Sequence, residues 1–258
     1  ALEAAGKTLG KMGKKALLVT DPMMIELGNC AKVEQVLRDA GVAYSIFSDI
    51  TGEPTDEMVK QGLRQYLAEG CDFLVALGGG SPMDTMKSIG VLASDGGEDI
   101  TVYMGKEIDA AVPPMAAIPT TAGTGSEATQ FSIINDTKNN VKMLLKGKVM
   151  LPDLAIVDPQ FTMTAPPRVT VNTGLDALCH AVEAYTSRKA QTMSDVFAVS
   201  AVKRIFKNLP VVYRDGKNEA ARIEMSVASL EAGIAFNNAS VTLIHGMSRP
   251  IGAQSPFV

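Results

Sequence analysis

Short apolar runs alternate with amphipathic stretches over the first 160 residues of this 258-residue chain, and this alternation constrains its fold more than any other feature. The runs are continuously apolar, which is typical of strands buried on both faces of a parallel sheet. We expect strands at residues 16–20, 42–47, 73–77, 115–118 and 154–157, separated by helices. The sequence therefore predicts an N-terminal α/β domain with a parallel sheet over residues 1–163.

The pattern changes after Pro166-Pro167. Helical periodicity without a strand signal marks residues 170–187, 190–207 and 219–248. Two segments, Asn208-Leu209-Pro210 and Asp215-Gly216, are expected to break helices. We therefore expect an all-helical domain over residues 164–258, incomplete at its C-terminus.

Composition and charge exclude several classes of partner. The net charge of −4 argues against nucleic acid or an anionic membrane, since neither attracts a negative chain. Cys30, Cys71 and Cys179 are far apart and form no CxxC pair, so we expect no disulfide framework and a cytoplasmic location. No apolar run approaches the roughly 20 residues of a membrane helix. Ala1 starts inside a helical pattern and residues 255–258 carry no helix stop, so we expect truncation at both ends.

A glycine-rich turn, Gly78-Gly79-Gly80-Ser81, stands between an apolar strand and a helix. Glycine allows a close approach to phosphate, and a helix N-terminus offers unpaired N–H groups. Ser81 can cap the helix or donate to a phosphate oxygen. A tight turn without any ligand is the alternative. The chain has neither a GxGxxG nor a GxxxxGK[ST] motif, so the turn alone does not identify a nucleotide site.

A second polar loop, Pro119–Glu127, follows the expected strand at residues 115–118. Its hydroxyl groups come from Thr120, Thr121, Thr124 and Ser126. Open α/β sheets bind ligands at the carboxyl ends of their strands, so a dinucleotide cradle is favoured over a plain polar loop.

The chain has two histidines, and both lie in informative surroundings. Asp176 and His180 are four residues apart on an expected helix and therefore share one face, as Fe²⁺, Zn²⁺ or Mn²⁺ ligands require. An ordinary Asp–His hydrogen bond is the alternative. Glu183 lies near that face, as a supporting group or a surface residue. His245 has apolar neighbours and would usually be a core histidine; the alternative is a three-ligand site together with Asp176 and His180.

Four segments together resemble the iron-containing (group III) alcohol dehydrogenase family, which has a dehydroquinate-synthase-like fold. They are Gly78–Asp84, Pro119–Glu127, Thr173–Tyr185 and His245–Ala253, in the family's order along almost the whole chain. The resemblance implies a Rossmann-like dinucleotide-binding domain, a helical metal and substrate domain, NAD, and Fe²⁺ or another divalent metal such as Zn²⁺. It implies a small alcohol or aldehyde as substrate, and we expect a homo-oligomer.

The resemblance also assigns roles to single residues. Pyrophosphate is expected at Gly79, Gly80 and Ser81, with Asp84 on the same helix; the nicotinamide side is expected at Thr120, Thr121 and Thr124; and Lys142 matches a cofactor-contacting lysine. Asp21 matches a carboxylate that faces the adenosine ribose and favours NAD over NADP, because it repels a 2′-phosphate. A simple turn-forming role for Asp21 is the alternative.

The chain departs from the family pattern at two points. The family's metal has four protein ligands, of which Asp176, His180 and His245 match three. The fourth, a histidine, is expected one position beyond Val258. Many members also carry a histidine of a proton path where this chain has Arg249.

The implied activity is reversible hydride transfer between a primary alcohol and NAD⁺, with Asp176, His180 and His245 acting through the metal. One alternative is an enzyme similar to dehydroquinate synthase or glycerol-phosphate dehydrogenase. Another is a catalytically impaired dinucleotide-binding fragment that binds metal weakly and turns over poorly, because one ligand is missing.

Overall fold

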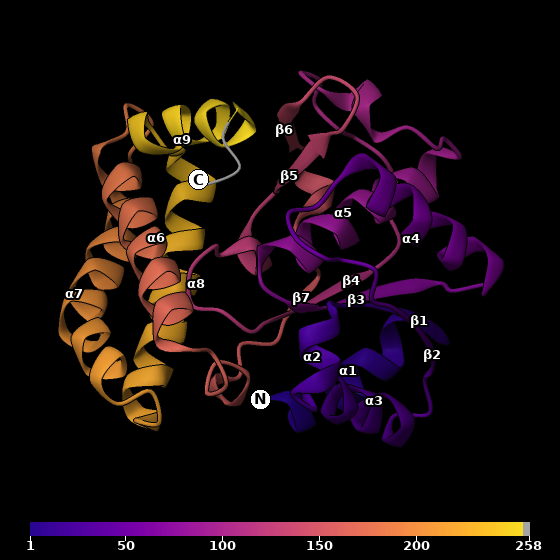
Figure 1. Ribbon diagram of the computed structural model, residues 1–258, viewed down its shortest axis with the longest axis horizontal. Helices are drawn as coiled ribbons and strands as arrows, with labels where there is room; N and C mark the ends of the chain where they lie inside the picture. Colours follow the sequence, from indigo (N-terminus) through magenta and orange to yellow (C-terminus); the bar gives the residue numbers. More distant parts are fainter. Residues whose placement is uncertain (255–258) are drawn as a thin grey trace. The chain divides into compact units, whose positions relative to one another are not determined.

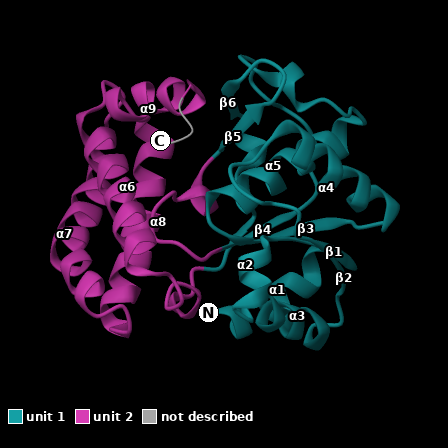
Figure 2. Cartoon of the chain, viewed as in Figure 1, with its two compact units in different colours: residues 1–118, 130–156 teal, residues 119–129, 157–258 magenta. Residues whose placement is uncertain are grey.

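The computed structural model describes residues 1–254 and divides into two compact units (Figure 2). Unit 1 comprises residues 1–118 and 130–156, and unit 2 comprises residues 119–129 and the chain from residue 157 onward. The chain end at residues 255–258, where we expected no helix stop, lies outside the described residues.

Unit 1 is built on a five-stranded sheet with the strand order β2-β1-β3-β4-β7 (Figure 1). Its strands are β1 (Lys15–Val19), β2 (Ala43–Phe47), β3 (Phe73–Gly78), β4 (Met115–Pro119) and β7 (Leu154–Ala155). Strand β1 pairs in parallel with both β2 and β3, and β4 pairs in parallel with β7. The expected parallel sheet is confirmed. Residues Ala16–Val19 and all of β3 are buried, which explains their continuous apolar character.

Helices lie on both faces of this sheet: α1, α2 and α3 on one face, and α4 and α5 on the other (Figure 1). Their bounds are α1 (Leu2–Met12), α2 (Pro22–Glu26), α3 (Asn29–Asp39), α4 (Asp56–Ala68) and α5 (Gly80–Asp95), with 3₁₀ turns η1 (Ile100–Tyr103) and η3 (Lys148–Met150). Side-chain N-caps define the first residues of α2 and α4. The Asp21 carboxylate accepts from the Met24 N–H at α2, and the Thr55 hydroxyl accepts from the Met58 N–H at α4.

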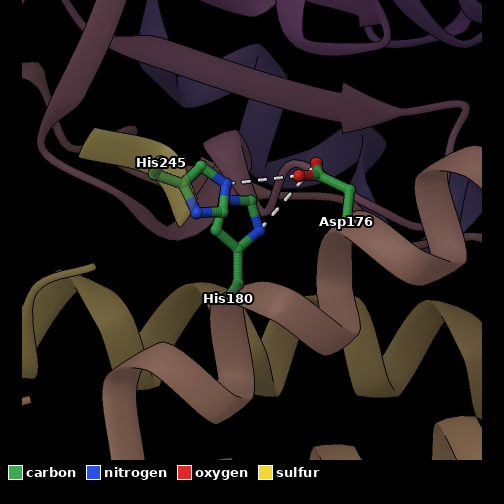
Figure 3. Close-up of side chains that lie close together, drawn as sticks. All are labelled: Asp176, His180 and His245. Carbon is green, nitrogen blue, oxygen red and sulfur yellow. Dashed lines mark hydrogen bonds and ion pairs between the residues drawn. The ribbon is translucent and has the colours of Figure 1, made fainter. Parts of the chain in front are cut away.

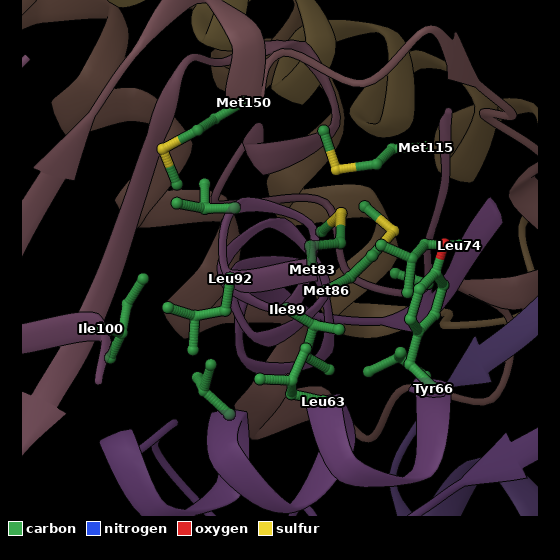
Figure 4. Close-up of a cluster of buried hydrophobic side chains, with 14 of the residues drawn as sticks. Leu63, Tyr66, Leu74, Met83, Met86, Ile89, Leu92, Ile100, Met115 and Met150 are labelled. Carbon is green, nitrogen blue, oxygen red and sulfur yellow. The ribbon is translucent and has the colours of Figure 1, made fainter. Parts of the chain in front are cut away.

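The core of unit 1 is centred on α5, which packs against β3, α4 and a β-hairpin (Figure 4). Met83, Met86 and Ile89 of α5 are fully buried, together with Leu63 of α4 and Leu74 of β3. Flexible methionine side chains fill irregular spaces between such elements. Because α5 packs against elements on several sides, the core fixes where the helix begins.

The hairpin was not expected from the sequence. It consists of β5 (Phe131–Asp136) and β6 (Val141–Lys146), paired antiparallel and joined by a turn in which Asn140 has φ of 53°. The buried positions of the hairpin alternate with partly buried or exposed ones, and Ile134, Met143 and Leu145 belong to the core of unit 1. Such a short, half-buried ribbon gives a weaker apolar signal than a central strand.

Unit 2 is helical, as expected, and contains α6 (Pro167–Thr186), α7 (Thr192–Arg214), α8 (Glu219–Ala239) and α9 (Leu243–Gln254), with 3₁₀ turns η2 (Ser126–Ala128) and η4 (Pro159–Phe161). The expected break at Asn208-Leu209-Pro210 was wrong, because α7 continues through Pro210 to Arg214. Ile205 and Val212 are buried in the same core on either side of Pro210, and this packing outweighs the loss of one backbone N–H.

The single helix expected over residues 219–248 was also wrong, because the chain breaks after Ala239 and restarts at Leu243. Ser240 adopts φ of 75° at the break. Within the described residues, no single helix has both the length and the hydropathy to cross a bilayer; α8 and α9, bent by 96°, pass only as a pair and only by length and composition.

The loop at residues 119–129 packs with the helices of unit 2, whereas the expected boundary placed it in the domain of residues 1–163. Gly125 of the loop and Gly233 of α8 allow this close packing. Gly125 has φ of 62°, and a Cβ atom on it would lie 2.7 Å from the Gly233 Cα atom of α8. The compact units thus differ from the expected division in this loop, and the domain boundary near residue 163 stays a prediction.

Arg222 offers a test of how unit 2 is held together. Its buried guanidinium donates to the Gly216 carbonyl (2.9 Å), the Thr170 hydroxyl (2.9 Å) and the Ala165 carbonyl (3.1 Å). We expect Arg222→Met to destabilise the unit by about 2–4 kcal/mol, because one buried and two partly buried oxygens lose their donor. Urea unfolding followed by helical circular dichroism measures this loss. The exposed Lys203→Met is the control, and equal midpoints for both variants would contradict the expectation.

Candidate metal centre

Three side chains of unit 2 converge at the junction of α6 and α9 (Figure 3). Asp176 and His180 project from one face of α6, and His245 lies in the first turn of α9. One potential ligand atom from each residue lies within 4.8 Å of the other two. An Asp176 oxygen is 3.3 Å from His245 Nε2, and its other oxygen is 3.9 Å from His180 Nδ1. The structure thus brings together the three residues that the sequence singled out.

Ring stacking restricts the orientation of His180. Its imidazole lies between the rings of His245, with centroids 4.2 Å apart, and Phe236, with centroids 4.3 Å apart. The planes deviate from parallel by 16° and 23°. Because α8 supplies Phe236 and α9 supplies His245, both helices position the histidine of α6.

A backbone carbonyl sets the protonation of His180. The Gly123 oxygen, which can only accept, is 3.3 Å from Nδ1, so Nδ1 carries the proton in this hydrogen bond. Burial lowers the pKa of His180 and favours the neutral ring. The second nitrogen, Nε2, then has a free lone pair, as a metal ligand requires.

Glu183 sets the orientation of His245 in a similar way. One carboxylate oxygen accepts from His245 Nδ1, which leaves Nε2 facing Asp176. Burial acts to lower the pKa of His245, but its contacts with Asp176 and Glu183 outweigh burial and raise it. Burial acts to raise the pKa of Asp176 and of Glu183; contacts with His245 outweigh it, so both groups stay ionised. Glu183 is 3% exposed, so the surface alternative for this residue was wrong.

The donor set fits a divalent first-row transition metal. Two imidazole nitrogens and one carboxylate oxygen are typical ligands of Fe²⁺, Zn²⁺ and Mn²⁺. His245 presents Nε2 to Asp176, whereas the His180 nitrogen 3.9 Å from Asp176 is Nδ1. Three protein ligands also leave coordination positions for another ligand or for substrate.

Unit 1 carries an open cavity of about 490 Å³ at the carboxyl ends of β1, β2 and β3. Since β2 and β3 flank β1 on opposite sides, the strand order reverses here, and ligands of open α/β sheets bind at such a point. The lining residues are Asp21, Pro22, Met23, Ile50, Thr51, Gly52, Gly79, Gly80, Ser81 and Pro82. Gly79 occupies the cap position of α5, and no side-chain hydrogen bond caps the helix, so Ser81 is not the cap.

The other predicted cofactor residues have varied surroundings. Asp21 both lines the cavity and caps α2, and burial raises its pKa. The Asp84 carboxylate accepts from the Ile133 N–H (2.8 Å) of β5. The Lys142 ammonium is 2.6 Å from the Glu53 carboxylate.

Arg249 and the threonines of the loop lie in unit 2. The Arg249 Nε–H donates to the His245 carbonyl (3.1 Å), so this side chain holds the backbone of a ligand residue. Thr120, Thr121 and Thr124 flank Gly123, whose carbonyl contacts His180. Their cofactor roles stay predictions.

Residues 1–159 match the model for the iron-containing alcohol dehydrogenase family, and residues 170–256 match the model for its C-terminal part. The chain therefore belongs to the iron-containing alcohol dehydrogenase family.

Individual relatives agree with this assignment. The chain is 40% identical to the NAD-dependent methanol dehydrogenase of Bacillus methanolicus (98% of this chain, 66% of that one) and 41% identical to the 1,3-propanediol dehydrogenase of Citrobacter freundii (95% and 64%). A crystal structure of 1,3-propanediol oxidoreductase superimposes with a TM-score of 0.95 at 39% identity (98% and 66%). The chain spans about two thirds of the length of these relatives.

Proposed function

We propose that this chain carries the dinucleotide-binding and metal-binding parts of an NAD-dependent alcohol dehydrogenase that interconverts a small primary alcohol and its aldehyde. The observation that carries the proposal is the convergence of Asp176, His180 and His245, in a chain of the iron-containing alcohol dehydrogenase family. The names of its relatives, a methanol dehydrogenase and a 1,3-propanediol dehydrogenase, support a small alcohol as substrate.

The chemistry needs a Lewis acid and a hydride acceptor. A divalent metal, Fe²⁺ or Zn²⁺, supplies the first when bound, and NAD⁺ supplies the second. Asp176 contributes negative charge to the site, and His180 and His245 each contribute a ring nitrogen. Gly123 and Glu183 hold these rings through their Nδ1 atoms. The proposal thus gives the protein the tasks of binding, orientation and charge balance.

For the dinucleotide, the cavity of unit 1 supports the assignments made from the family resemblance. The uncapped N-terminus of α5 at Gly79, Gly80 and Ser81 suits a pyrophosphate, which accepts from backbone N–H groups. The Asp21 carboxylate lines the same cavity, where it would accept from ribose hydroxyls and repel a 2′-phosphate. NAD is therefore favoured over NADP.

The nicotinamide end is assigned to the loop of unit 2. Thr121 and Thr124 lie within two residues of Gly123, whose carbonyl contacts His180, so their hydroxyls belong to a segment that reaches the metal centre. Asp84 and Lys142 are assigned to the cofactor by resemblance alone, since each has a protein partner in unit 1. A cytoplasmic location and a homo-oligomeric assembly remain predictions.

The test is alcohol oxidation by the purified chain after removal of metal with a chelator. We expect NADH and aldehyde to form in equal amounts when Fe²⁺ or Zn²⁺ is restored together with NAD⁺ and a short primary alcohol. NADPH formation from NADP⁺ should be slower. Equal rates with and without metal would contradict the proposal, as would NADH formation that does not depend on the alcohol.

Gly123 provides a test of the loop's contribution to metal binding. A Cβ atom at this position would lie 2.6 Å from Thr173 Cβ and 2.9 Å from the Thr173 carbonyl oxygen, so the loop must move away from α6. We expect Gly123→Ala to weaken Zn²⁺ binding about 10-fold, because the carbonyl that orients His180 is withdrawn. Titration calorimetry measures this. Gly246→Ala, at a position with open space, is the control, and equal affinities would contradict the expectation.

A further inference from the structure

Glu183 is a buried carboxylate of α6 that holds the His245 ring and to which the family resemblance assigns no role. It is 3% exposed, and its oxygens are shared between two tasks. One oxygen accepts from the Thr242 N–H (3.0 Å), the Thr242 hydroxyl (3.0 Å) and the Ile244 N–H (2.8 Å). The other accepts from His245 Nδ1. A single side chain therefore ties down both the start of α9 and the histidine in its first turn.

The first task explains why Glu183 is tolerated as a buried charge. The first N–H groups of a helix have no partner inside the helix, and a carboxylate near them is favourable. Thr242 and Ile244 present two such N–H groups at the break between α8 and α9. The carboxylate of α6 thus acts as a cap supplied by another helix. Capping uses one oxygen of Glu183, and the other oxygen is bonded to His245.

The second task decides which nitrogen of His245 is available. A carboxylate can only accept, so Nδ1 donates its proton to Glu183. The opposite nitrogen, Nε2, then faces the Asp176 oxygen at 3.3 Å. Glu183 does not compete as a ligand, because it binds the ring nitrogen that points away from Asp176 and is not part of the three-residue cluster.

We propose that Glu183 is a positioning residue that holds His245 with Nδ1 protonated and Nε2 directed at the metal, and thereby sets the metal affinity. This inference rests on the proposed metal site. Carboxylates that accept from the outer nitrogen of a metal-bound histidine orient the ring and increase its basicity, and their loss lowers metal affinity by 10- to 100-fold in general. Glu183 combines this role with capping of α9, so the ligand and its helix share one anchor.

Two variants separate the roles. In Glu183→Gln, the amide oxygen still accepts from Thr242 and Ile244, but the amide N–H₂ faces His245 Nδ1 and forces the neutral ring to carry its proton on Nε2. In Thr242→Val, one hydroxyl donor to the cap is lost while the Glu183–His245 bond stays. We expect about 10- to 100-fold weaker Zn²⁺ binding for Glu183→Gln and less than about a 3-fold change for Thr242→Val by titration calorimetry. Unchanged affinity in Glu183→Gln would overturn the inference.

A measurement on the wild-type chain keeps the inference testable even where a variant fails to fold. With two histidines in the chain, ¹⁵N–¹H correlation spectra of the imidazoles can be assigned ring by ring. We expect zinc on Nε2 and a proton on Nδ1 of His245. Zinc on Nδ1 of His245 would overturn the inference and leave the proposed function intact. A wild-type chain that binds no zinc would overturn the proposed metal site and this inference with it.

Discussion

Replacing His180 by phenylalanine is expected to weaken binding of Zn²⁺ or Fe²⁺ by about 100-fold or more, while the metal-free chain keeps its fold. The substitution removes one of the three donors that converge at the junction of α6 and α9. The two that remain, Asp176 and His245, are held in place by different helices, α6 and α9. A loss of this size follows if the site consists of these three residues.

Phenylalanine is chosen because it keeps the packing. The ring of His180 is buried between those of Phe236 and His245, and an aromatic ring of similar width can stack in the same place. Alanine would instead leave a cavity and confuse a loss of ligand with a loss of fold. We therefore expect the melting temperature of the metal-free variant to match or exceed that of the wild type.

The control is Cys179→Ala, one residue before His180 on the same helix. Thiolates are strong metal ligands, but Cys179 is not among the clustered residues, and burial raises the pKa of its thiol. Its loss should leave Zn²⁺ affinity unchanged, as measured by calorimetry after chelator treatment. If Cys179→Ala weakened binding as much as His180→Phe, the ligand set described above would be wrong.

The second large effect is expected at the glycine-rich turn of unit 1. Gly78 has φ of 155°, which side chains of L-residues rarely adopt, and a Cβ atom on it would lie 2.4 Å from the Pro82 Cγ atom of α5. We expect Gly78→Ala to destabilise unit 1 by about 2–4 kcal/mol, because strain and overpacking add at a helix enclosed by the core. We also expect NAD⁺ affinity to fall about 10-fold or more, since the N-terminus of α5 has to move.

Gly41→Ala is the matched control for this variant. Gly41 also lies in unit 1 with positive φ, 72°, but an added Cβ meets nothing within 4 Å. The Gly41→Ala variant should lose only about 1 kcal/mol of folding stability through backbone strain, and its NAD⁺ affinity should not change. Urea midpoints and calorimetric titration with NAD⁺ give both quantities. Equal losses of stability and of NAD⁺ affinity in the two variants would show that the contact with Pro82 contributes to neither.

Much of the fold could be predicted because its signals are local. The strands of the sheet are continuously apolar, and Gly41, Gly70 and Gly78, at turns between elements, have positive φ. The hairpin of β5 and β6 was missed, since its burial depends on contacts with α5 that lie more than 40 residues away in sequence. The course of α7 through Pro210 likewise depends on tertiary packing rather than on local propensity.

The candidate metal centre also has features that are visible in the sequence and features that depend on tertiary structure. The spacing of Asp176 and His180 is a property of one helix and is visible in sequence. The position of His245 depends on the break at Ser240, which the periodicity of residues 219–248 conceals. Glu183 carried a usable signal, because it lies three residues after His180 and seven after Asp176, on the same face of α6. What could not be foreseen is that its partners come from the start of α9.

The most direct test of the metal centre is anomalous diffraction from crystals of the chain grown with one equivalent of Fe²⁺ or Zn²⁺, recorded at the absorption edge of that metal. We expect one strong peak about 2.0–2.2 Å from an Asp176 oxygen, from Nε2 of His245 and from a ring nitrogen of His180. A peak at another group of residues, or none at these three, would contradict the account.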